Sequence, residues 1–376
     1  MKELNDIVSA AKSLKNAGKN GALATVVKVQ GSAYRRPGAK MLFSETGREA
    51  GFISAGCLET DLFERARKVM SSNKPTIVSY DTSSTDDLIM GLGLGCNGLV
   101  ELFVEPLKNE ATLDKMVFFS ECVAKRQKAA IATVVDVHDS ATVSLADYLL
   151  VSPEGKVKTT IKEAQLASVL EEGAHVAVKD GLSKNNRYQL KQGEVDVFIE
   201  AILPPLPFVI VGAGPDAQPL IKLANELGWY TTLVDHRPAY AKQENFPLAD
   251  AVVLSRPDEL SEHVPIDNLS VVVIMTHNFP TDLKLLEALL PSPARYVGLL
   301  GPKSKSDLLL QHLNQDGFQV TKEQLAKLHS PVGLDIGAET PEEIAFSVIA
   351  EIKAVLEGRN AGFLKDLDGP IHGPTS

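Results

Sequence analysis

The chain has 376 residues, of which 44% are hydrophobic, and a formal net charge of -10. This length predicts two or three domains, because a single hydrophobic core stops growing at about 250–300 residues. The negative charge and the lack of a long Lys/Arg run exclude broad nucleic-acid binding, which needs a basic face. No apolar stretch reaches the roughly 20 residues of a membrane span, and the N-terminus has no apolar signal-peptide core. We therefore expect a cytoplasmic protein.

The N-terminal half contains an internal repeat. Four predicted elements recur in order: 22–29 with 130–137, 40–47 with 148–155, 59–70 with 162–173, and 98–107 with 193–203. In the first pair, ALATVVKV and AIATVVDV match at six of eight positions, and the first two pairs share an offset of 108 residues. We therefore predict that residues 1–110 and 111–205 are two copies of one small α+β unit.

Three segments of the first copy have no sequence match in the second: GSAYRRPG (31–38), AGCLE (55–59) and GLGLGCNG (91–98). The second copy acts as an internal control, because it shows what the unit needs merely to fold. The three segments are therefore candidates for chemistry rather than architecture. A second copy that has lost stabilising features is the alternative.

The segment at 31–38 follows a predicted strand and has the composition of a tight loop, with two glycines and a proline. It presents Arg35 and Arg36, and guanidinium groups bind phosphate or carboxylate through paired hydrogen bonds. The loop is therefore a predicted anion site. The alternative is a solvated turn with two surface arginines.

Two of the three cysteines lie in the other unmatched segments, and an odd number of cysteines argues against a disulfide framework. Cys57 precedes a predicted amphipathic helix, whose positive dipole end lowers the pKa of a thiol. Cys96 lies among four glycines, which let the backbone approach a ligand closely. Two cysteines are too few for a closed zinc site and suit a soft metal or a sulfur-bearing ligand. The alternatives are a buried thiol at 57 and hairpin packing at 91–98.

The proline-rich segment ILPPLP (202–207) predicts a boundary, because proline interrupts helices and sheet ladders. Residues 206–376 then alternate between predicted strands and helices. We predict an α/β fold with a C-terminal Rossmann-like, doubly wound parallel sheet, preceded by the duplicated small α+β unit.

The third part opens with a dinucleotide-binding fingerprint. In VIVGAGPDAQPL a strand leads into Gly212 and Gly214, and Ala217 takes the third small position. Asp235 ends the next predicted strand, 23 residues after Gly212, where a ribose-binding acid is expected. The order of strand, turn, helix and strand favours a nucleotide site.

Two residues argue against a simple NAD site. Asp216 would lie near the pyrophosphate and repel it. Arg237 follows Asp235 closely and is a candidate for binding a phosphate. We therefore predict a crevice for a nucleotide-like group, with NAD(P) as one option.

Later loops of the third part should face the same crevice, because ligands bind at the carboxyl ends of parallel strands. Thr276 and His277 follow one predicted strand, and His277 can act as a base or ligand near neutral pH. Lys303 and Lys305 follow the next strand as a candidate phosphate grip. The alternatives are a hydrogen-bonded structural histidine and a solvated lysine loop.

The last predicted helix begins in TPEEIAFSVIAEIKAVLEG. Thr340 is the expected N-cap, and Glu343 completes a capping box. The apolar residues Phe346, Val348 and Ile352 predict a well-buried helix that serves packing or dimerisation.

Taken together, seven motifs make the chain similar to the XdhC/CoxI family: GSAYRRPG, ISAGCLE, GLGLGCNG, VGAGPDAQPL, THN, YVGLLGPKSK and SPVGLDIGAETPEEIAFSVIAEI. The resemblance runs in one order along nearly the whole chain, except its middle segment. Cys57 and Glu59 match one family motif, and Cys96 matches a second glycine-cysteine loop. Ala55 stands where many relatives have glycine, which is a small-for-small change.

The resemblance implies an accessory protein for molybdenum hydroxylases such as xanthine dehydrogenase. Such a protein binds the molybdenum cofactor, as molybdopterin or its dinucleotide form, protects it while a terminal sulfur is installed, and hands it to the apoenzyme. Cys57 and Cys96 would then lie near molybdenum. Apo xanthine dehydrogenase or a related hydroxylase, a cysteine desulfurase and a second copy of the chain are the implied partners.

Two alternatives stay open. An NAD(P)-dependent oxidoreductase with His277 as acid and base would turn over a small substrate without a partner. A regulatory nucleotide-binding module would leave mutation of Cys57 and Cys96 without effect.

Overall fold

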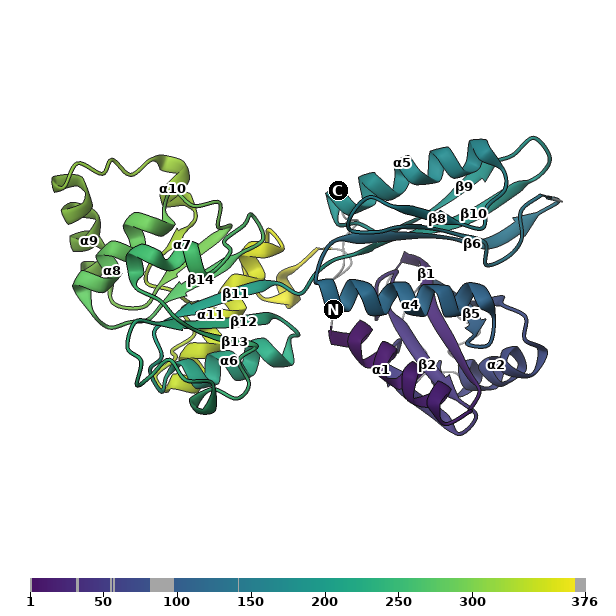
Figure 1. The fold of residues 1–376 in the computed structure, drawn as a ribbon, viewed down its shortest axis with the longest axis horizontal. Helices are drawn as coiled ribbons and strands as arrows, with labels where there is room; N and C mark the ends of the chain where they lie inside the picture. Colours follow the sequence, from purple (N-terminus) through teal and green to yellow (C-terminus); the bar gives the residue numbers. More distant parts are fainter. Residues whose placement is uncertain are drawn as a thin grey trace. The chain divides into compact units, whose positions relative to one another are not determined.

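The computed structural model describes residues 2–31, 34–54, 56, 58–81, 98–140 and 142–368 (Figure 1). The chain divides into two compact units: residues up to Pro204 together with the chain from Leu367 form the first, and Pro205–Asp366 form the second. Within the described residues, no helix has the length and apolar character that a membrane span needs.

The first unit contains two five-stranded sheets with one order of elements. The first sheet and its helices comprise α1 (Lys2–Asn16), β1 (Gly21–Gly31), β2 (Lys40–Ser44), β3 (Gly47–Gly51), α2 (Glu59–Ser72), β4 (Thr76–Asp81) and β5 (Gly98–Pro106). The second comprises α4 (Glu110–Lys125), β6 (Ala129–His138), β7 (Tyr148–Val151), β8 (Val157–Thr159), α5 (Ala164–Asp180), β9 (Lys184–Gln189) and β10 (Glu194–Ile202). The strand orders are β3-β2-β1-β5-β4 and β8-β7-β6-β10-β9, so the duplicated α+β architecture is confirmed.

Both sheets bury their two faces by strict alternation of side chains. In β1, Ala22, Ala24 and Val26 pack toward α2, and the matching positions of β6 pack toward α5. On the opposite faces, Leu23 and Ile131 share one core with α1 and α4. These two helices therefore lie between the sheets (Figure 1). They are one more matched pair, which the sequence comparison missed.

The second unit is one parallel sheet of six strands in the order β13-β12-β11-β14-β15-β16. Its strands are β11 (Pro207–Val211), β12 (Tyr230–Asp235), β13 (Ala251–Leu254), β14 (Val271–Ile274), β15 (Tyr296–Leu299) and β16 (Leu328–His329). Its α-helices are α6 (Ala217–Glu226), α7 (Leu260–His263), α8 (Phe279–Leu289), α9 (Lys303–Gln315), α10 (Lys322–Ala326) and α11 (Pro341–Leu356). Short 3-10 helices cover Gln243–Asn245, Pro257–Glu259 and Leu364–Asp366.

This strand order, with the first strand central and a reversal between β11 and β14, is that of a Rossmann fold. Helices α6 and α11 cover one face, and α7, α8 and α9 cover the other. The predicted doubly wound sheet is confirmed. Its crevice lies at the carboxyl ends of β11 and β14, where the order reverses.

Helix α11 begins as predicted. The Thr340 hydroxyl accepts a hydrogen bond from the Glu343 backbone N–H, and the Glu343 carboxylate accepts one from the Thr340 backbone N–H. Val348 and Ile352 are buried against the sheet. Phe346, predicted to be buried, is 58% exposed. The prediction was wrong there because Phe346 lies on the outer side of the helix.

Candidate functional site

The loop that carries the arginines has a structural twin in the second copy. In the first copy, Gly38 N–H donates to Val26 O and Val26 N–H donates to the carbonyl of the residue after Gly38. In the second, Ala146 N–H donates to Val134 O, and the return hydrogen bond is also present. Gly38 and Ala146 both have positive φ, at 98° and 72°. The inference that GSAYRRPG has no counterpart is thus corrected for the described end of the loop: its backbone there has a twin in the second copy, and its side chains differ.

The two arginines have different environments. Arg35 donates to the Glu3 carboxylate at 2.6 Å and to Phe52 O at 2.7 Å, so it ties α1 to the strand end after β3. Arg36 is exposed, and its side chain has no hydrogen bond or ion pair to the described residues. At the matching positions of the second copy stand buried Val143 and exposed Ser144. Arg36 is therefore the arginine available to an anion.

Glu59 is the first residue of α2. Its Oε1 atom is buried and has no hydrogen-bond partner among the residues that the structure describes. Just before the helix, the Ser54 hydroxyl accepts from Leu58 N–H at 3.3 Å. A buried carboxylate oxygen without a donor is costly, and it indicates a place for a ligand N–H or O–H.

Cys57 and Cys96 lie outside the described residues, so their predicted roles stay predictions. The third cysteine, Cys122 on α4, is fully buried in the core between the sheets. Burial raises the pKa of the Cys122 thiol to about 12. Cys122 is thus a structural thiol.

The turn after β11 requires glycine at its first position. Gly212 has a φ of 124°, and a Cβ there would lie 2.6 Å from Met275 O. The turn therefore packs directly against the end of β14. A Cβ on Gly214 would collide with the Asp216 carboxylate, so this second glycine makes room for an acid at the start of α6.

Asp235 and Arg237 hold each other at the end of β12. The Asp235 carboxylate accepts hydrogen bonds from the backbone N–H groups of Ala213 and Arg237 and from Arg237 Nε and Nη2, at 2.7–2.9 Å. Burial opposes ionisation, but these hydrogen bonds outweigh it and lower the pKa of Asp235. Four donors fill the lone pairs of a carboxylate. A ribose diol would therefore have to displace Arg237, whose guanidinium also lies 3.9 Å from the Tyr240 ring centre.

His277 crosses the mouth of the crevice. Its Nε2 atom lies 2.8 Å from Asp216 Oδ2, and its own φ is 55°, a left-handed conformation that costs a non-glycine residue energy. This pair places an imidazole over the glycine turn. The Asp216 carboxylate that was predicted to repel a pyrophosphate thus has a hydrogen-bonding partner in His277.

Thr276 and Lys305 converge on a residue that the sequence motifs did not indicate. The fully buried Asp282, in the first turn of α8, accepts from Thr276 Oγ1 at 2.5 Å and pairs with Lys305 Nζ at 2.5 Å. Lys303 is exposed at the start of α9. Of the two lysines predicted to bind a phosphate, Lys305 therefore neutralises Asp282. Lys303 is the one that remains exposed to solvent. The sequence signal that could have indicated Asp282 is a carboxylate in the first turn of a helix that begins soon after a strand end.

The predicted residues thus form two groups. Gly212, Gly214, Asp235, Arg237, Thr276 and His277 lie at the carboxyl edge of the parallel sheet. Arg35, Arg36 and Glu59 belong to the first unit. The arrangement is that of a protein with a Rossmann crevice in its second unit and candidate arginine and carboxylate groups in the α+β first unit.

Comparisons with known proteins agree with this class. The XdhC Rossmann domain profile matches residues 208–352, and the profile of the XdhC and CoxI family matches residues 14–81. A Bacillus subtilis protein named as a probable xanthine dehydrogenase subunit is 32% identical over 332 residues, which cover 88% of this chain and 91% of the relative. The chain belongs to the XdhC/CoxI family.

Two further relatives span most of the chain. The molybdenum cofactor insertion chaperone PaoD of Escherichia coli is 23% identical over 90% of this chain and 84% of its own length. A crystal structure described as a xanthine dehydrogenase from Bacillus halodurans superposes with a TM-score of 0.75 at 30% identity, covering 94% of this chain and 96% of that one.

Proposed function

We propose that this protein is a maturation factor that binds the molybdenum cofactor and delivers it to a molybdenum hydroxylase of the xanthine dehydrogenase type. The relatives support this role by their names, since one is a molybdenum cofactor insertion chaperone and another is named for xanthine dehydrogenase. The observation that carries the proposal is that the first copy contains both an exposed arginine, Arg36, and a buried carboxylate oxygen, Glu59 Oε1, neither of which has a side-chain partner among the described residues.

The first copy offers groups that match the chemistry of this cargo. Molybdopterin has a phosphate, a flat pterin with N–H donors, and a dithiolene that holds molybdenum. Arg36 suits the phosphate, because its guanidinium has no protein partner in the described part of the chain. Glu59 Oε1 suits a pterin N–H, because the oxygen is buried and lacks a donor. Cys57 and Cys96 would supply soft sulfur near the metal.

The Rossmann crevice would hold a nucleotide-like group, either that of the dinucleotide form of the cofactor or NAD(P). Arg237 has 41% of its side chain exposed and is the candidate for a phosphate. Asp235 becomes available to a ribose only when Arg237 turns away from it. Lys303 and the Asp216–His277 pair border the same edge.

The division of labour follows the domains predicted at 1–110, 111–205 and 206–376. The first binds the cargo, the second is its structural partner, and the third binds the nucleotide-like group. Apo xanthine dehydrogenase or a related hydroxylase would receive the cargo in the cytoplasm. A cysteine desulfurase and a second copy of this chain are the further proposed partners.

Anaerobic binding of isolated molybdenum cofactor tests the proposal. We expect saturable binding by the full chain that weakens in Cys57→Ala, Cys96→Ala and Arg36→Ala. Cys122→Ala is the matched control, because Cys122 is buried in the core and should not touch cargo. The loaded wild type should restore activity to an apo hydroxylase, and the weakened variants should not.

An NAD(P)-dependent oxidoreductase is the competing function. The Asp216–His277 pair favours it, because a carboxylate that orients an imidazole is a common acid-base arrangement. Failure to retain molybdenum cofactor, together with substrate-linked NAD(H) turnover that His277→Asn abolishes, would replace the carrier proposal with this one.

A further inference from the structure

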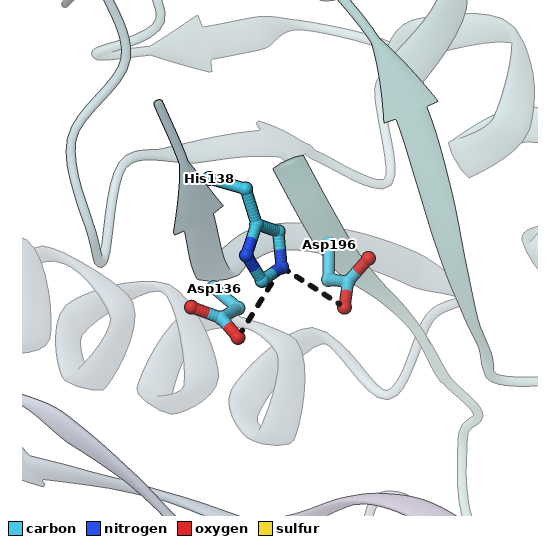
Figure 2. A group of neighbouring side chains, drawn as sticks. All are labelled: Asp136, His138 and Asp196. Atoms are coloured by element: carbon cyan, nitrogen blue, oxygen red, sulfur yellow. Dashed lines mark ion pairs between the residues drawn. The ribbon is translucent and has the colours of Figure 1, made fainter. Parts of the chain in front are cut away.

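Three potential metal ligands converge on one face of the second sheet (Figure 2). Asp136 and His138 are two residues apart on β6, so their side chains share a face. Asp196 is the cross-strand partner of Asp136 on β10. One ligand atom from each of the three residues lies within 4.8 Å of the other two.

The separation between His138 and Asp136 suits a four-coordinate ion, and the separation between His138 and Asp196 is slightly longer than such an ion requires. His138 Nε2 lies 3.4 Å from Asp136 Oδ2 and 3.9 Å from Asp196 Oδ2. Ligands about 2.0–2.2 Å from a tetrahedral zinc ion lie about 3.3–3.6 Å from one another. Two of the three side chains, those of His138 and Asp136, are more than one-third exposed, so an ion has a path from solvent.

The Nε2 atom of His138 has no hydrogen-bond partner among the described residues. His138 Nε2 is buried and makes no hydrogen bond to any described residue, although two carboxylates flank it. The Asp136 and Asp196 carboxylates each have other partners: Asp136 Oδ1 accepts from the Val137 backbone N–H at 2.8 Å, and Asp196 accepts from Arg187. A buried nitrogen directed between two carboxylates is placed where all three groups can coordinate one cation.

The charged side chains around the cluster include more carboxylates than cations. Arg187 donates through Nε and Nη2 to Asp196 and through Nη1 to Glu194. Arg187 thus orients Asp196, as the hydrogen-bond partners of metal-bound carboxylates do. Asp136, Asp196 and Glu194 carry three carboxylates, against which Arg187 and, at longer range, Lys28 act, and Lys28 is itself paired with Glu101.

The first copy shows how the same position is neutralised without a metal. Both central strands have a register shift just before this point, and Lys28 then pairs with Glu101 as Asp136 pairs with Asp196. In the first copy, Lys28 Nζ lies 3.4 Å from the Glu101 carboxylate. The second copy has an aspartate in place of the lysine. The Lys28 ammonium is therefore part of the strand pair itself in the first copy, whereas in the second copy Asp196 is approached by Arg187 from β9 and, at longer range, by Lys28.

We propose that Asp136, His138 and Asp196 bind a divalent first-row transition-metal ion, and zinc fits the spacing between His138 and Asp136. This site goes beyond the proposed function, because its ligands lie in the second copy and take no part in the cofactor site. One imidazole and two carboxylates leave a fourth position for water or another ligand.

The test uses tag-free full-length protein with Cys57→Ala and Cys96→Ala as background, so that thiols do not bind the probe. Calorimetric titration with Zn²⁺ alone should show one site, which weakens by at least about tenfold in His138→Gln. Glutamine is the residue at the matching position 30 of the first copy. His175→Gln is the matched control, because His175 is exposed on α5 and outside the cluster.

A second measurement reports coordination directly. Co²⁺ bound by the same background protein should give the strong visible absorption of a four-coordinate ion, which Asp136→Asn removes without changing the circular dichroism of the fold. Equal Zn²⁺ binding by wild-type background and His138→Gln, or no saturable binding by either, would overturn the proposal. Neither result would affect the molybdenum cofactor experiment, which does not use these residues.

Discussion

The two copies of the N-terminal unit share a backbone and differ in the charges that they place on it. Their strand orders, register shifts and loop hydrogen bonds match. Yet Arg35 and Arg36 correspond to Val143 and Ser144, and Lys28 corresponds to Asp136. A loop can therefore look functional in sequence because it is needed for folding. Only the side chains that differ between the copies are candidates for function.

The buried charges of the core show the same pattern. Glu105 on β5 and Glu200 on β10 occupy matching positions, since their cross-strand partners Leu23 and Ile131 match. Lys115 of α4 neutralises Glu105, whereas Lys40 of β2 neutralises Glu200. Both copies thus have a glutamate at this position, but the lysine that neutralises it comes from α4 in one case and from β2 in the other.

The largest expected difference concerns the cysteines. Because burial raises the pKa of Cys122 to about 12, its thiolate fraction at pH 8 is about a thousandfold below that of a free thiol with a pKa of about 8.5. Iodoacetamide followed by peptide mass spectrometry should therefore leave Cys122 unmodified while Cys57 reacts. Rapid labelling of Cys122 in the folded protein would show that the core between α1 and α4 opens readily.

Breaking a buried ion pair should have the next largest effect. Glu105→Gln leaves the Lys115 ammonium without its partner in the core, and we expect a loss of about 3 kcal/mol in the free energy of unfolding. Glu200→Gln should cost less, because the Glu200 side chain is 14% exposed and that of Glu105 is 5% exposed. Urea denaturation measures both.

The control for this pair is the double variant Glu105→Leu with Lys115→Met. Replacing both charges with apolar groups of similar size should recover most of the loss. An equal loss of unfolding free energy in Glu105→Gln and Glu200→Gln would contradict the prediction, because it would mean that the difference in side-chain exposure has no effect on stability.

The sequence was sufficient to predict β1, β2 and β5 and their counterparts β6, β7 and β10, because the repeat is readable over short stretches. It did not predict β4 and β9, the edge strands of the two sheets. It missed the match of α1 with α4, since KELNDIVSAAKSLKN and EATLDKMVFFSECVAK share only the spacing of apolar residues. A helix that packs between two sheets needs apolar character on its faces and little else. The Rossmann order was predictable because its fingerprint is local.

The site was less predictable because its contacts are distant in sequence. Asp136 and His138 are visible as a pair on one strand face, but Asp196 joins them only through a register that the bulge at Val135 sets. Likewise, nothing local connects Asp282 with Lys305. Pairing between elements decides which candidate side chains are free and which are neutralised.

The two arginines should separate stability from binding. Arg35→Ala removes charged hydrogen bonds to Glu3 and the Phe52 carbonyl, and should cost about 1.5 kcal/mol of unfolding free energy. Arg36→Ala should change stability by less than about 0.5 kcal/mol, because the side chain is exposed. It should nevertheless weaken cofactor binding. Urea denaturation and anaerobic cofactor titration of the same two samples provide the comparison, and full cofactor affinity in Arg36→Ala would contradict it.

The smallest expected effect lies at the twin positive-φ positions. Gly38→Ala should cost about 1 kcal/mol, because alanine is strained there but its Cβ would meet nothing closer than 3.7 Å. Ala146→Gly relieves the same strain yet removes a methyl group that is buried between the sheets, so the two terms should nearly cancel. Thermal unfolding of both variants measures the difference. A loss of several kcal/mol in Gly38→Ala would show that the loops differ in backbone as well as in side chains, because Ala146 already demonstrates that the shared conformation accepts a Cβ.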